Sequence, residues 1–124
     1  MLTSLFLHAA LAAEPSLVIK AEPLPNSDDR TATRLEDAVK AAPEPWIACW
    51  TAANPPADAL RFLGLRVIMR SSDGTLKKAK ITTSIEDKGI EACALGLLGQ
   101  IHLDPRPVFD DHLDVGLTWV NPAP

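Results

Sequence analysis

Two cysteines, Cys49 and Cys93, are the residues of this chain most able to do covalent chemistry, and they are its only thiols. An even number of cysteines in an exported chain favours a disulfide, and closing a loop of this length adds about 4 kcal/mol of stability on a chain-entropy model. Two alternatives stay open. The cysteines could be buried thiols in a reducing compartment, or a redox pair, which the absence of a Cys-x-x-Cys spacing disfavours.

Histidine and aspartate, both ligands of divalent metals, crowd the C-terminal third of the chain. His112 and Asp114 have strand spacing on one face, and His102 and Asp104 could approach them. A metal held by this cluster would make the protein a small metal-assisted hydrolase. Neither His-x-Asp spacing is an established ligand signature, however, so we prefer an acidic surface in solvent and expect no metal or other cofactor.

Composition and missing motifs argue against several other functions. The chain has no Gly-x-Ser-x-Gly motif and no glycine-rich phosphate loop, so we expect no enzyme activity. Its net charge is −4, although residues 61–88 carry seven basic and three acidic side chains. Because this basic stretch contains a single aromatic residue, Phe62, and both flanks are acidic, we expect no nucleic-acid partner.

A β-hairpin is predicted between the two cysteines, over residues 65–84. Asp73-Gly74 suits a two-residue type I′ turn, because glycine adopts the required positive φ without steric cost. Apolar residues alternate with polar ones on both sides of this turn, which gives the first strand one buried face. That face carries Leu63, Leu65, Val67 and Met69. A lone hairpin is unstable in water, so helices and further strands must cover it.

Three helices and a third strand are predicted around the hairpin. A cap at residues 27–29 begins a helix of residues 30–42, Pro45 opens a short apolar helix with Cys49, and Glu86 or Asp87 opens a helix with Cys93. We expect at least two of the three tryptophans in the core. Residues 112–120 alternate as a strand whose inward face carries Leu113, Val115, Leu117 and Trp119.

The N-terminal part divides into two segments before the domain. Residues 1–13 are apolar and end in small residues, which is typical of an export signal and too short to span a bilayer, so we expect no stable membrane anchor. Residues 14–29 contain three prolines and are predicted to be an extended lead-in or an edge strand. Residues 30–124 are then a single α+β domain.

The ordered elements resemble the C-terminal domain of TonB, and more closely its cysteine-bearing relatives in the myxobacterial AgmX/PglI C-terminal group. The likeness covers about residues 46–120. It rests on residues in chain order: Cys49 in an apolar helix, Val67-x-Met69 before Asp73-Gly74, Leu76-x-x-Ala79-x-Ile81-x-x-Ser84, and Cys93 ahead of a Pro-x-Pro and a final strand. Leu103 stands where that group usually has an aromatic residue. The resemblance implies the fold and an envelope setting, and it does not imply energy transduction.

These observations predict an α+β fold in which a three-stranded antiparallel sheet carries two or three helices on one face. The function we expect is a non-enzymatic protein-interaction module, periplasmic or secreted, with an envelope protein or peptide as its partner. The third strand would be a sheet edge that captures an extended peptide through Leu113, Val115, Leu117 and Trp119. The alternatives are the metal-assisted hydrolase with His102 and His112, or a purely structural envelope protein.

Overall fold

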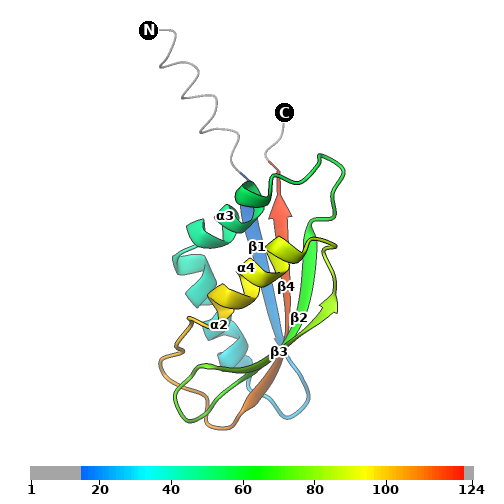
Figure 1. Ribbon diagram of the computed structural model, residues 1–124. Coiled ribbons are helices and arrows are strands. Elements are labelled where there is room, and N and C mark those ends of the chain that lie inside the picture. The colour runs from blue at the N-terminus through cyan, green and yellow to red at the C-terminus, as the bar shows by residue number, and fades with distance from the viewer. Residues whose placement is uncertain (1–14, 122–124) are drawn as a thin grey trace, which may run out of the picture.

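The computed structural model in Figure 1 describes residues 15–121. Along the chain the elements are β1 (Ser16–Pro23), α2 (Asp29–Ala41), α3 (Glu44–Ala53), β2 (Phe62–Met69), β3 (Leu76–Thr83), α4 (Lys88–Leu98) and β4 (Asp111–Val120). The predicted export signal lies outside the described residues. Within them, no helix has the length and apolar character needed to cross a bilayer.

The α+β class is confirmed, but the sheet has four strands rather than three. All neighbours are antiparallel and the order is β1-β4-β2-β3. The additional strand, β1, comes from the proline-containing segment that we predicted to be a lead-in or an edge strand. It pairs along its whole length with β4, from Ser16 opposite Val120 to Pro23 opposite Leu113, so the domain begins well before residue 30.

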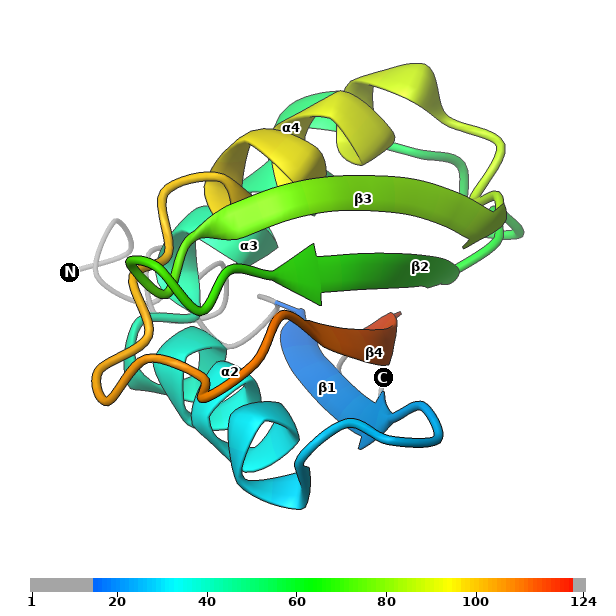
Figure 2. The same cartoon turned by 90° about the horizontal axis from the view of Figure 1, so that it is seen from below.

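Among residues 15–121, helices cover one face of the sheet and leave the other uncovered. Figure 2 shows α2, α3 and α4 on the same side of the sheet. The alternation predicted for β2 and β4 is confirmed, because every expected inward residue of these strands is at most 2% exposed: Leu63, Leu65, Val67, Met69, Leu113, Val115, Leu117 and Trp119. We call the opposite, uncovered side the open face.

Local signals place the helix ends close to where the sequence predicts them. The Asp28 carboxylate accepts a hydrogen bond from the Arg30 amide and begins α2, and Asp87 caps α4 by accepting one from the Ile90 amide. Pro45 stands in the first turn of α3, where its missing N–H costs no hydrogen bond. Asn54 ends α3 in the left-handed conformation with φ of 47°.

A cluster of tryptophans joins α3 to β4. Trp119 is fully buried, its ring stacks on Trp50 with centroids 6.0 Å apart, and its indole N–H donates to the carbonyl of Trp46 over 2.9 Å. The guanidinium of Arg61 lies 5.3 Å from the centre of the Trp50 ring. All three tryptophans are therefore core residues. The hydrogen bond to the Trp46 carbonyl satisfies the indole N–H of Trp119, which burial removes from water.

The disulfide between Cys49 and Cys93 is confirmed and joins α3 to α4. Its two Cα atoms are 5.7 Å apart, within the usual range for this bond. Cys49 is only 3% exposed, whereas Cys93 faces solvent. In the sequence, α3 precedes the hairpin of β2 and β3 and α4 follows it. The disulfide therefore joins two helices that the whole hairpin separates along the chain.

The hairpin itself is confirmed, but its turn is not the predicted two-residue type. A loop of residues 70–75 joins the strands, and of Asp73 and Gly74 only Gly74 has a positive φ, 74°. The Gly74 carbonyl accepts a hydrogen bond from the Leu103 amide, and a Cβ on Gly74 would lie 2.3 Å from the Leu103 carbonyl oxygen. The loop departs from a minimal turn because it packs against a segment distant in sequence.

Replacing Gly74 with alanine is expected to lower the free energy of unfolding by about 2 kcal/mol, because the side chain would meet both an unfavourable φ and the Leu103 carbonyl. Equilibrium urea unfolding measures the change. Gly96→Ala is the matched control, because Gly96 has no atom near its missing Cβ and stands inside α4, where alanine adds up to about 1 kcal/mol. Equal effects from both variants would contradict the assignment.

Removing the disulfide with Cys49→Ala and Cys93→Ala together is expected to cost about 4 kcal/mol, because the unfolded chain regains the freedom that the cross-link removes. Urea unfolding of the double variant and of the oxidised protein gives the difference. Adding a reductant to the wild-type protein should reproduce the loss. A change below about 1 kcal/mol would show that the bond contributes little to stability.

Candidate functional site

The predicted peptide-binding edge is wrong, because β4 is an interior strand. Leu117 pairs with Ile19 of β1 on one side and with Leu63 of β2 on the other. Backbone groups on both sides of β4 are therefore used within the sheet, and no extended peptide can add to it. The four residues proposed for that edge, Leu113, Val115, Leu117 and Trp119, are buried core residues instead.

The histidine and aspartate cluster of the hydrolase alternative does not assemble. Within residues 15–121, no three His, Cys, Asp or Glu side chains come together as a metal site. The carboxylates make other contacts: Asp110 binds Lys77 and Ser71, Asp111 is buried against the Thr31 hydroxyl, and Asp114 binds Arg66. The described residues therefore give no support to metal-assisted hydrolysis.

The true edges of the sheet are β1 and β3, and they differ in how far they are covered. On β1, the Ala21 amide donates to the Glu36 carboxylate of α2 over 2.7 Å, so part of this edge is already bonded. On β3, the ladder with β2 accounts for the backbone pairing of residues 77–83, and no other backbone hydrogen bond involves them among the described residues. Among the described residues, β3 is therefore the less covered edge, with free N–H and C=O groups along residues 77–83.

Lysines and two irregularities mark the β3 edge. The register with β2 shifts at Thr82 and at Lys77, each an extra residue on β3. Lys78 and Lys80 lie opposite Ile68 and Arg66, so they stand on the open face, and neither makes an ion pair within the described part of the chain. Bulges and lysines on an edge strand hinder pairing with a second copy of the same chain.

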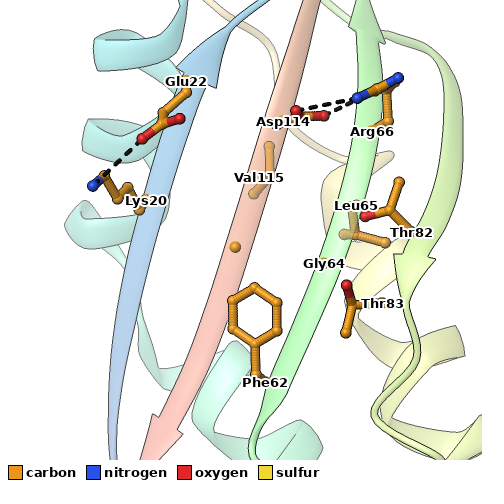
Figure 3. A pocket seen from close by; sticks show the side chains of 11 residues that line it. Lys20, Glu22, Phe62, Gly64, Leu65, Arg66, Thr82, Thr83, Asp114 and Val115 are labelled. Atoms are coloured by element: carbon orange, nitrogen blue, oxygen red, sulfur yellow. Dashed lines mark hydrogen bonds and ion pairs between the residues drawn. The ribbon is translucent and has the colours of Figure 1, made fainter.

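The open face contains a shallow hollow of about 380 Å³ at its centre. Its floor is a pair of glycines that lie opposite each other, Gly64 on β2 and Gly116 on β4. Figure 3 looks onto this face and shows Phe62 near one end of the hollow and the Arg66–Asp114 pair near the other. We call this feature the glycine hollow; its lining residues are Lys20, Glu22, Phe62, Gly64, Leu65, Arg66, Thr82, Thr83, Asp114, Val115 and Gly116.

Sequence reasoning missed both the β3 edge and the glycine hollow. A glycine inside a strand is an available signal, because it weakens the strand unless a close approach requires it, and Gly64 and Gly116 are such residues. Their opposition across two strands depends on the register, however. No local pattern places β4 beside β2, so the pair becomes visible only in the folded sheet.

Comparison of the chain with protein-family models, with characterised proteins and with solved structures gives no match.

Two carboxylates hold the loop that begins β3. Asp73 accepts hydrogen bonds from the hydroxyl of Thr75 at 2.6 Å and from its amide at 3.0 Å, and these bonds lower the Asp73 pKa. Asp110 accepts from the amide of Ser71 at 2.8 Å and from Lys77 at 3.2 Å, and these contacts lower the Asp110 pKa. Because both groups are exposed, they fix the position of the loop more than they stabilise the whole fold.

Acidification is expected to release this loop. A carboxylate whose folded pKa is lowered contributes stability that is complete above its unfolded value, near 3.8, and is lost as the pH falls through the lowered folded value. The amide shifts of Ser71 and Thr75, followed by NMR, should therefore titrate with midpoints below 3.8. Asp110→Asn should remove the titration at Ser71 and leave that at Thr75. Midpoints at or above 3.8 would contradict the assigned contacts.

Proposed function

We propose that the protein is a non-enzymatic interaction module of the cell envelope that binds an extended acidic peptide along β3. The observation that carries the proposal is the β3 edge, which no strand of residues 15–121 covers, with two lysines that make no ion pair within that range, Lys78 and Lys80. A peptide that adds to a sheet edge gains main-chain hydrogen bonds, and its alternate side chains give specificity.

The chemistry of the peptide follows from the two sides of β3. On the open face, the side chains opposite Lys78 and Lys80 would be acidic and two residues apart, because cross-strand neighbours of opposite charge attract. On the helix side, β3 presents Ala79 and Ile81, which pack against the core and are partly exposed. A strand that alternates acidic and apolar residues therefore fits this edge.

Two further points support the envelope setting. A disulfide between Cys49 and Cys93 is typical of oxidising compartments such as the periplasm or the cell exterior. The residues that resemble the TonB C-terminal domain, including both cysteines, imply the same location. A purely structural envelope protein would share these features but would not bind a peptide at β3.

A synthetic peptide that alternates Glu with Val tests the proposal. In NMR titrations, it should shift the amides of residues 76–83 and leave those of β1 unchanged. Lys78→Glu with Lys80→Glu should weaken binding about tenfold, because two exposed charge pairs turn from attractive to repulsive.

Two controls make the test specific. Arg34→Glu with Lys40→Glu changes the net charge equally but lies on α2, and it should leave binding unchanged. A peptide of the same composition with its Glu and Val residues in separate blocks should bind more weakly, because it loses the alternation. Equal binding of both peptides, or shifts outside β3, would refute the proposal.

A further inference from the structure

We propose that the glycine hollow is a binding site for a neutral saccharide. The site lies on the open face of the sheet and includes Thr82 and Thr83 at the end of β3, but it uses side chains over a glycine floor, whereas the proposed peptide uses the backbone edge of β3. It therefore goes beyond the function proposed above. Its volume of about 380 Å³ falls in the range of small-molecule sites.

The strand register arranges the hollow as three parallel rows across the sheet. The floor row runs from Lys20 through Gly116 and Gly64 to Thr83, one residue from each strand. Because its two central residues have no side chains, the floor is backbone flanked by taller rows. With strands about 4.8 Å apart, this row is about 14 Å long, enough for a short oligosaccharide.

One wall of the hollow is aromatic. Phe62 of β2 forms this wall and is 44% exposed. Thr118 of β4 and Val18 of β1 continue its row across the sheet, outside the lining of the hollow. A Cβ on Gly116 would lie 2.8 Å from Cε1 of the Phe62 ring, so the ring edge reaches over the glycine. Figure 3 shows the flat side of this ring facing the viewer who looks onto the open face. An exposed ring face suits the apolar C–H side of a pyranose.

The other wall is charged but internally neutralised. Asp114 binds Arg66 through two contacts of 2.9 and 3.2 Å, and Glu22 lies 3.4 Å from Lys20. A charged ligand would have to compete with these pairs, whereas a neutral one can use their remaining donor and acceptor positions. Neighbouring hydroxyls of a sugar donate and accept in the same way.

Two threonine hydroxyls complete the site at the β3 end. Thr82 Oγ1 and Thr83 Oγ1 both lie 3.0 Å from the point where Gly64 would carry a Cβ, so they border the floor. Neither side chain makes a hydrogen bond among the described residues, and both are exposed. The hollow thus combines an aromatic surface, paired charges and free hydroxyls, and this combination favours a saccharide over a lipid or an ion.

NMR titration of the full chain with a neutral tetrasaccharide of N-acetylglucosamine, and separately of glucose, tests the proposal. At least one of them should cause saturable shifts at the amides of Gly64, Gly116 and Thr83. Phe62→Ala should weaken binding at least fivefold, through loss of the ring surface. The matched control is Phe109→Ala, which removes another exposed phenylalanine away from the hollow and should change nothing.

Thr83→Val is a second variant that preserves the shape of the side chain and removes only the hydroxyl; it should weaken binding even if Phe62→Ala disturbs the sheet. The absence of saturable shifts with both sugars, or shifts confined to other residues, would overturn the proposal. Equal or tighter binding of a galacturonate oligosaccharide would overturn its neutral character. Phe62→Ala should not affect the Glu/Val peptide, so the two proposed sites can fail independently.

Discussion

The fold depends on β4, which is hydrogen-bonded on both sides. Its last inward residue, Trp119, stacks on Trp50 and donates to the Trp46 carbonyl, so the same strand also holds α3 against the sheet. Two strands far apart in sequence, β1 at the start and β2 in the middle, belong to one sheet only because β4 lies between them and pairs with both. Without β4, β1 would have no partner strand and the core would lose Leu113, Val115, Leu117 and Trp119.

The central position of β4 determines which surfaces are free for partners. It leaves β1 and β3 at the edges, and α2 covers part of β1 through the bond between Glu36 and the Ala21 amide. Because all three helices lie on one side, the other side of the sheet is open to solvent (Figure 2). A free edge and an open face are thus consequences of one topology, and each offers a different chemistry: main-chain groups at the edge, and side chains over a glycine floor on the face.

The disulfide stabilises the part of the molecule that the sheet holds least. The helix α4 packs on α3 and contributes Ile90, Ala94 and Leu98 to the core, and the bond from Cys93 to Cys49 fixes that contact covalently. The loop of residues 70–75 is held differently, by the exposed carboxylates of Asp73 and Asp110 and by the close approach of Gly74 to Leu103. The covalent bond is insensitive to pH, whereas the carboxylate contacts weaken in acid.

The sequence by itself determined the local elements: period-two alternation marked the inward faces of β2 and β4, and the paired cysteines indicated the cross-link. Capping residues placed the start of α2 within residues 27–29 and that of α4 at Glu86 or Asp87, and the structure selects Asp28 and Asp87. The strand faces and helix starts depend on neighbours a few residues apart, and the disulfide has only one possible pairing because the chain contains two cysteines. Only the tertiary structure decided that β4 is central, that a six-residue loop replaces the two-residue turn, and that Gly64 faces Gly116. Those outcomes depend on strand order and on contacts between distant segments, and alternation along a single strand carries no information about either, because a central strand and an edge strand can bury the same face.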